Sequence, residues 1–316
     1  MTRPTRPTVP TPSTTTSEEC TDVSAPPLAF GAENPSADCI ADSAGGLTFD
    51  LDAPGSAEAA AHWSAALVLR RRGGAAGGSE DEVRLPLAPS GAGRVRAVLP
   101  STVALPEGRW DVHVACGEAT PQRLLPGLAD LRSLVDRKPG PSTSPLAVRI
   151  PYATKHGNLS LRSWLRAPHA EAGDVLVGES GITGHGSLYR VEDPAAWLAG
   201  AVVEARCRRD ANLVRTAEVT VDGQDFTFAF SYAELCEEWR GGLDVWDLWL
   251  RGPGGEGTEP VRIARILDDV ADKKQIFTYP AKSFSAAYAP ARVSPYYTVD
   301  NDLSIRVDER PPVAAR

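Results

Sequence analysis

The chain has 316 residues, a formal net charge of −8 and a sequence pI near 5.3. A nucleic-acid partner requires a concentration of basic side chains against the phosphates, and this balance argues against one. Hydrophobic residues make up 42% and charged residues 23%, which is the composition of an ordinary globular protein. The 28 glycines and 27 prolines indicate many turns and therefore favour strands over helices.

The chain begins with a segment rich in threonine, proline and serine that lacks the apolar core of a secretory signal. We interpret residues 1–37 as a disordered tail. No run of about 18 apolar residues is present, so we expect no transmembrane segment and a cytoplasmic protein. The histidines are dispersed and no CxxC pair occurs, which predicts reduced thiols, no metal site and no cofactor. The cysteines are Cys20, Cys39, Cys116, Cys207 and Cys236.

Beyond this tail, apolar and polar residues alternate with a period of two, the pattern of half-buried strands. Residues 46–51 and 225–230 are clear examples. An Asp-Gly pair at 222–223 predicts a hairpin, because glycine accepts the positive φ of a tight turn. Short helices are expected at 193–198 and at 232–239. The fold class is therefore all-β.

Several short motifs occur twice in the same order. Pro-Tyr-Ala-Thr at 151–154 and Leu-Ser-Leu-Arg at 159–162 return as Pro-Tyr-Tyr-Thr at 295–298 and Leu-Ser-Ile-Arg at 303–306. Trp-Asp-Val-His-Val, starting at Trp110, returns as Trp-Asp-Leu-Trp-Leu, starting at Trp246. We interpret this as two copies of one β-sandwich domain, with both tryptophans in the cores.

The predicted boundaries follow from a run rich in proline, glycine and serine. We expect the first β-sandwich domain at 38–137, a linker at 138–147, the second domain at 148–309 and a tail at 310–316. The last Pro-Tyr motif either closes the second domain or begins a truncated third repeat. Both alternatives remain open at the level of sequence.

Two groups of residues are candidates for binding. Trp249 points away from Trp246 on the predicted strand, which suits a sugar-stacking or protein-contact surface. Arg70, Arg71 and Arg72 follow an apolar run and could meet an anionic polymer. More often, however, such an arginine run is the solvated end of a strand.

No catalytic residues can be assigned, and the weak candidates are Asp300 and Asp302. Such an Asp-x-Asp pair can chelate the divalent ion of a nucleotide-sugar diphosphate. The strand-helix alternation and the glycine-rich phosphate loop of a nucleotide-binding domain are both missing from the sequence. Turn residues therefore explain the pair better than a metal site does. The charged run at 268–274 predicts a solvated loop that leads into a strand.

The runs at 151–162, 246–250 and 261–265 resemble the immunoglobulin-like tandem β modules at the C-termini of Gram-positive wall-polymer transferases. Those enzymes are glycosyltransferases or glycerophosphotransferases of teichoic-acid type, and stand-alone relatives of the modules are often named only "transferase". The resemblance covers residues 38–308 and omits the catalytic nucleotide-sugar domain, so no catalytic residue carries over. It implies an accessory role.

Our leading hypothesis is a non-catalytic accessory module that binds a carbohydrate or wall polymer, or a transferase encoded elsewhere. Such a protein would lie in the cytoplasm or peripherally at the inner membrane face. The hypothesis also allows the protein to form a homo-oligomer. One alternative is an enzyme of the glycosyl- or glycerophosphotransferase type that acts on a nucleotide-activated donor. Another alternative is a structural scaffold.

Overall fold

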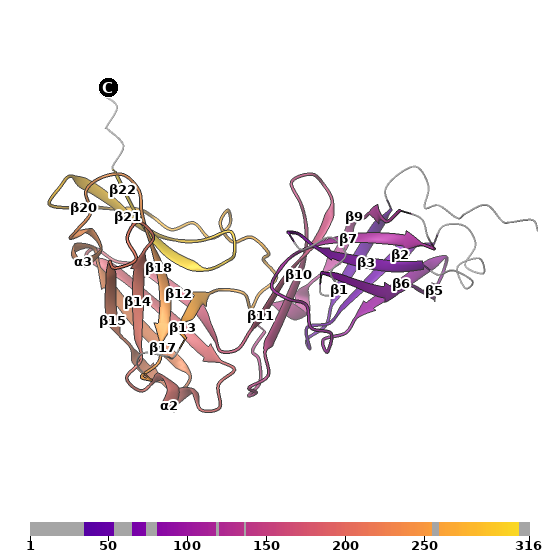
Figure 1. Cartoon of the computed structure of the whole chain (residues 1–316), viewed down its shortest axis with the longest axis horizontal. Coiled ribbons are helices and arrows are strands. Elements are labelled where there is room, and N and C mark those ends of the chain that lie inside the picture. The colour runs from indigo at the N-terminus through magenta and orange to yellow at the C-terminus, as the bar shows by residue number, and fades with distance from the viewer. Residues whose placement is uncertain are drawn as a thin grey trace, which may run out of the picture.

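The computed structural model describes residues 35–53, 65–73, 81–117, 120–135, 137–254 and 259–309. The predicted tails lie outside the described residues, apart from positions 35–37, where the first strand begins. Strands dominate and form several sheets, as the alternating pattern predicts (Figure 1). Within the described ranges, no helix is long and apolar enough to cross a membrane.

The N-terminal unit has two sheets around one hydrophobic core. The first sheet has the order β5 (Ala88–Gly91), β6 (Arg94–Leu99), β2 (Leu47–Asp52), β1 (Ser36–Ala41) and β9 (Leu125–Asp130). The second has the order β10 (Leu146–Ala153), β11 (Leu159–Arg166), β7 (Gly108–Cys116), β3 (Ala65–Arg71) and β4 (Glu82–Pro86), with β8 (Gln122–Arg123) also paired to β7. A short 3₁₀ turn, η1 (Arg132–Leu134), follows β9.

The central strand β7 shows why the sequence folds in this way. Its residues Trp110, Val112 and Val114 are buried, while Asp111 and His113 point to the opposite face. The indole nitrogen of Trp110 donates to the carbonyl oxygen of Pro106 at 3.2 Å, so burial of the ring leaves no unpaired N–H. The predicted core position of Trp110 is confirmed.

Strands β10 and β11 pair with the N-terminal unit, whereas the predicted boundary assigns residues 148–166 to the second domain. Leu161 of β11 lies opposite Trp110 of β7, and Trp164 is buried in the N-terminal core. Residues 138–147 therefore lead into β10 and do not separate the units. The chain crosses at Ala167 and Pro168, between β11 and β12. In Figure 1, β10 and β11 lie on the side of the N-terminal unit that faces the C-terminal unit.

The C-terminal unit is an 11-stranded sheet around a second hydrophobic core. Its main path is β16 (Thr220–Asp222), β17 (Asp225–Ser231), β13 (Gly181–Tyr189), β12 (His169–Val177), β19 (Val261–Ala264), β18 (Asp244–Arg251), β22 (Leu303–Glu309), β21 (Pro290–Tyr297) and β20 (Lys282–Ser285). Off this path, β14 (Val202–Cys207) pairs with β18 and with β15 (Val214–Glu218). The predicted hairpin at 222–223 joins β16 to β17.

Both predicted helices are present and have side-chain caps. In α2 (Pro194–Leu198), Asp193 accepts from the backbone N–H of Ala196. In α3 (Tyr232–Cys236), Ser231 and Glu234 form a capping box. The second helix is shorter than expected: it ends at Cys236 and does not include residues 237–239.

The last Pro-Tyr motif closes the C-terminal unit. Strand β21 pairs with β20 and β22, and β22 pairs with β18. Ile305 lies opposite Trp246, which is buried as predicted, and Ser304 lies opposite Asp247. This register equals that of β11 on β7, where Leu161 faces Trp110 and Ser160 faces Asp111. The motif therefore ends each unit, and the alternative of a truncated third repeat does not fit this pairing.

Replacing a core tryptophan should destabilise the chain strongly. Trp110→Ala is expected to lower the free energy of unfolding by about 3–5 kcal/mol, because it leaves a cavity in a fully buried core. Leu128→Ala, at a position that is 80% exposed in β9, should change it by less than about 0.5 kcal/mol. Urea unfolding followed by circular dichroism measures both, and equal losses would contradict the assignment of the core.

Candidate functional site

Asp300 and Asp302 lie in the turn between β21 and β22, where they contact arginines of the N-terminal unit. The Asp300 carboxylate is 2.5 Å from an Arg162 nitrogen and 3.3 Å from an Arg109 nitrogen. Asp302 is 3.3 Å from Arg166. In addition, the indole N–H of Trp164 donates to the carbonyl oxygen of Asp300 at 3.2 Å. The predicted Asp-x-Asp pair therefore joins the two units.

The surroundings of this turn do not gather metal ligands. Burial raises the pKa of Asp302, and the nearby Arg166 and Arg262 offset only part of that effect. Each carboxylate faces guanidinium groups, which carry the positive charge that a divalent ion would otherwise supply. Among the described residues there is no group of three or more histidine, cysteine, aspartate or glutamate side chains that could hold a metal ion.

Trp249 lies on the outer face of β18 and is partly buried beneath arginines. The guanidinium carbons of Arg206 and Arg262 are 5.4 Å and 5.3 Å from the centre of the indole ring. Cation–π attraction of this kind holds the arginines over the aromatic face. The ring is therefore not the open stacking surface that its place in the sequence suggests.

The three consecutive arginines go to different partners. Arg70 pairs with Glu82 on β4 at 2.8 Å. Arg71 donates to the carbonyl oxygen of Glu107 at 2.5 Å. Arg72 turns toward β7 and binds Asp111. Only Arg71 and Arg72 line the hollows described below, so the arginine run is not one continuous patch.

Asp111 is the centre of a polar cluster on the outer face of β7. Arg72 donates to it at 2.7 Å, Arg123 approaches it at 2.8 Å, and the Ser160 hydroxyl donates to it at 3.1 Å. Burial alone would raise the pKa of Asp111, but the hydrogen bonds from both arginines outweigh burial and hold the pKa below its ordinary value. Asp111 therefore stays ionised and fixes both guanidinium groups in place.

The C-terminal unit carries the same cluster around Asp247. Arg208 donates to it at 2.9 Å, Arg262 at 2.7 Å and Ser304 at 2.8 Å. The repeated Trp-Asp motif is the sequence signal for both clusters. The sequence analysis used the motif to place its tryptophans in the cores and assigned no role to its aspartates. The arginine partners could not be found from the motif, because they lie on other strands.

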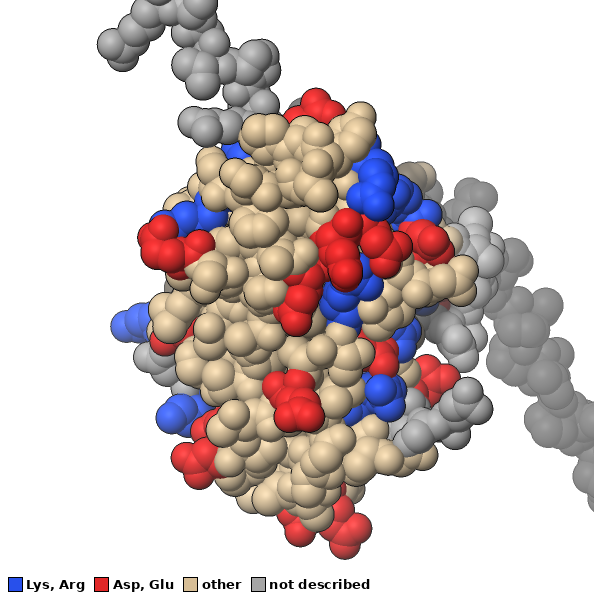
Figure 2. All heavy atoms as spheres, turned by 90° about the vertical axis from the view of Figure 1, so that its left-hand side faces the viewer, with Lys and Arg blue, Asp and Glu red and all other residues tan. Residues whose placement is uncertain are grey.

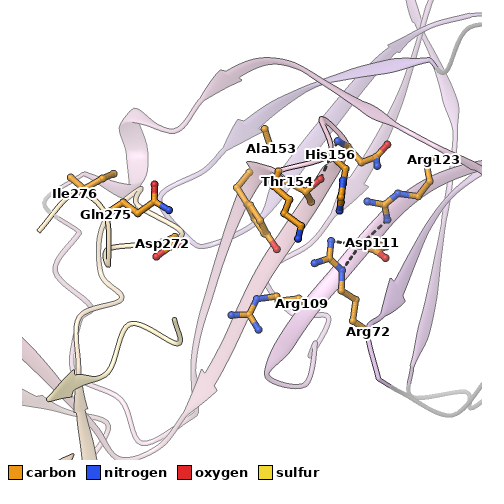
Figure 3. Close-up of a pocket in the computed structure, with 13 residues that line it drawn as sticks. Arg72, Arg109, Asp111, Arg123, Ala153, Thr154, His156, Asp272, Gln275 and Ile276 are labelled. Carbon is orange, nitrogen blue, oxygen red and sulfur yellow. Dashed lines mark hydrogen bonds and ion pairs between the residues drawn. The ribbon is translucent and has the colours of Figure 1, made fainter. Parts of the chain in front are cut away.

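The Asp111 cluster forms one wall of a cavity of about 860 Å³ at the junction of the two units. Figure 3 shows the arginines of the N-terminal unit on one side and Asp272 with Gln275 on the other. Arg109 also lines the cavity and donates to the carbonyl oxygen of Val299 at 3.0 Å. The cavity walls therefore come from both units.

The turn between β10 and β11 brings two basic side chains to this cavity. The backbone N–H of Asn158 donates to the Thr154 hydroxyl at 3.1 Å, and Gly157 has a φ of +77°. Lys155 and His156 lie between them and line the cavity. Within the part of the chain that the structure describes, neither Lys155 nor His156 has a hydrogen-bonding or ionic partner.

The opposite wall of the junction cavity comes from the loop after β19. The sequence analysis did not identify Lys273 as the residue that holds this loop. Lys273 is fully buried, with its Nζ 2.6 Å from a carboxylate oxygen of Asp268. Its backbone N–H donates to the Asn301 side chain at 3.1 Å. The expectation of a solvated run at 268–274 is therefore wrong at Lys273, and residues 275–279 form no strand.

A second hollow of about 890 Å³ shares Arg72 and Arg109 with the junction cavity. It adds Arg71 and Arg162 to the basic lining, together with acidic residues that include Asp300. The two hollows meet at the shared arginines and offer an extended polar surface. By contrast, acidic and basic groups lie next to each other on the end of the C-terminal unit shown in Figure 2.

No protein-family model matches the chain, and a search of curated proteins found no match. Among solved structures, the chain is similar to S. aureus TarS 217–571, with 13% identity, a TM-score of 0.27, and coverage of 63% of this chain and 56% of that chain. A second crystal structure of S. aureus TarS is 14% identical, has a TM-score of 0.27, and covers 61% of this chain and 35% of that chain. The chain thus spans less than two thirds of either, and a likeness of this degree carries no argument about function.

The Asp111 cluster should contribute to acid sensitivity. Because the pKa of Asp111 is lowered on folding, its stabilising contribution is complete above the unfolded value of about 3.9 and is lost as the pH falls through the folded value. Asp111→Asn removes this contribution, so the free energy of unfolding should fall less steeply between about pH 5 and about pH 3 than in the wild type. Urea unfolding across that range measures the slopes, and equal slopes would contradict the role of Asp111.

Proposed function

We propose that the chain is a non-catalytic binding module that holds a phosphate-bearing carbohydrate or polyol polymer in the junction cavity. The observation that carries this proposal is the pair Lys155 and His156, which have no partner in the described part of the chain and lie beside three arginines. The free ammonium group of Lys155 and the free imidazole of His156, next to fixed guanidinium groups, favour an anionic ligand.

The charge of the lining supports an anion. Four cationic side chains line the cavity against two carboxylates, Asp111 and Asp272. Asp111 is shared by Arg72 and Arg123, so one carboxylate faces two guanidinium groups. The surplus positive charge lies in a hollow with partly buried walls, where charge–charge attraction is stronger than in bulk water.

The shape and the remaining polar groups support a polymer of phosphate and hydroxyl groups. The two hollows that meet at Arg72 and Arg109 have room for successive phosphates along one chain. Tyr152, Asn158 and Gln275 add groups that donate to and accept from hydroxyls. A ligand pocket with several convergent polar groups is the usual basis for such recognition.

The sequence resemblance to modules of teichoic-acid type transferases agrees with this ligand class, because those enzymes build phosphate-bearing polymers. We infer in addition that the two units are copies of one immunoglobulin-like β-sandwich. The matching register of β11 on β7 and of β22 on β18 supports this, as do the matching clusters around Asp111 and Asp247. An accessory module of this kind would act together with a separate transferase.

Isothermal titration of the full chain with a poly(glycerol phosphate) oligomer tests the proposal. Lys155→Ala is expected to weaken binding by about tenfold, because it removes a cation that contacts phosphate. The slope of log affinity against log salt concentration should fall by about one. Neutral dextran of equal length should not compete for the cavity.

Arg240→Ala removes the same charge from an exposed position on the C-terminal unit and is the matched control. It should leave the affinity for the oligomer and its salt slope as in the wild type. Failure of the wild type to bind the oligomer, or equal losses in the two variants, would rule out the junction cavity as the site.

A further inference from the structure

We propose a second ligand site on the outer face of β12, β13 and β17, suited to a neutral polyhydroxylated group such as a sugar residue. A hollow of about 850 Å³ lies over these strands in the C-terminal unit. Arg137 and Lys138, from the segment that leads to β10, line it together with the sheet. This site stands apart from the proposed function and does not require phosphate binding at the junction.

Hydrogen-bonding side chains form two cross-strand pairs between β13 and β17. His185 lies opposite Thr227, and its Nδ1 is 2.9 Å from the threonine hydroxyl. Ser187 lies opposite Asp225 and donates to its carboxylate at 2.5 Å. These contacts orient the four side chains while Oδ2 of Asp225 and Nε2 of His185 have no hydrogen bond to another described side chain. Rigid, paired donors and acceptors of this kind suit vicinal hydroxyls.

The same residue types do not form a catalytic triad. A nucleophilic serine must donate its proton to the histidine, which a carboxylate then orients. Here the Ser187 hydroxyl donates to Asp225, and His185 contacts Thr227 instead. The arrangement is that of a binding surface.

Strand β12 contributes a glycine, Gly173, to the lining of the hollow. Gly173 lies where the register between β12 and β13 shifts, between Ala172 and Val175. The three heavy atoms nearest to a Cβ at Gly173 would be the carbonyl oxygen, carbonyl carbon and Cβ of His185, at 3.4–3.7 Å, which is ordinary contact. A larger side chain at this position would therefore extend into the hollow without a forced clash at Cβ.

The charge of the lining separates this site from the junction cavity. Arg137, Lys138 and Arg265 are balanced by three carboxylates, Glu171, Asp174 and Asp225, and Glu171 already accepts from backbone N–H groups at 266–267. In the described residues, Lys138 and Asp174 have no hydrogen-bonding or ionic partner. Balanced charges give no net attraction for a polyanion, whereas free groups of both signs can accept from and donate to hydroxyls.

A microarray of neutral oligosaccharides, probed with the full chain, tests the site. The wild type should be captured by neutral oligosaccharides, and Asp225→Ala should weaken capture by about tenfold, because a hydroxyl partner is lost. Gly173→Leu should abolish capture by filling the hollow. Arg240→Ala changes an exposed residue that does not line the hollow and should bind as the wild type does.

Urea unfolding checks that each variant is folded, and Asp225→Asn provides a milder change at the same exposed position if either variant is not. No capture of the folded wild type would overturn the proposal. Capture that survives both Asp225→Asn and Gly173→Leu would also overturn it. Loss of sugar capture in Lys155→Ala would place the sugar in the junction cavity and likewise exclude the second site.

Discussion

The two units are joined by the contact between the β21–β22 turn and the arginines of β7 and β11, together with Ala264, Ile266 and Leu267, which belong to the core of the N-terminal unit. Asp300 meets Arg109 and Arg162, and Asp302 meets Arg166. Burial lowers the pKa of Arg162, and Arg109 adds to this effect, so the Asp300 carboxylate compensates a guanidinium that has little access to water. Removing one partner of such a pair would leave an uncompensated charge. Since the junction cavity takes its walls from both units, this contact also sets its shape.

The turns at 154–158 and 298–302 have the same backbone and different roles. In the first, the N–H of Thr154 donates to the carbonyl oxygen of Asn158 at 2.9 Å; in the second, that of Thr298 donates to Asp302 at 2.8 Å. Gly157 and Asn301 both have positive φ. The second turn carries carboxylates that bind arginines and join the units, whereas the first carries Lys155 and His156 at the open cavity. The two turns thus share one backbone geometry, and their different side chains make one turn join the units while the other lines the cavity.

Local patterns predicted the parts of the fold that local forces decide. Alternation located strands such as β2 and β17, the repeated motif placed Trp110 and Trp246 in the cores, and both expected helices are present. The pairing of residues 148–166 with β7 was missed, because strand pairing is a long-range contact that linker composition does not report. For the same reason the cavity could not be predicted, since its basic side chains come from separate strands and a turn. Of the predicted binding residues, Arg71 and Arg72 line the hollows, while Arg70 and Trp249 are engaged elsewhere.

The most direct test of the account is to map where a phosphate-bearing polymer binds. Backbone amide shifts of the isotope-labelled full chain can be followed while a poly(glycerol phosphate) oligomer is added. The account predicts the largest changes at residues 153–158 and 275–276, from opposite walls of one cavity and from both units. Changes centred on other surfaces, or no changes at oligomer concentrations that saturate the titration, would contradict it.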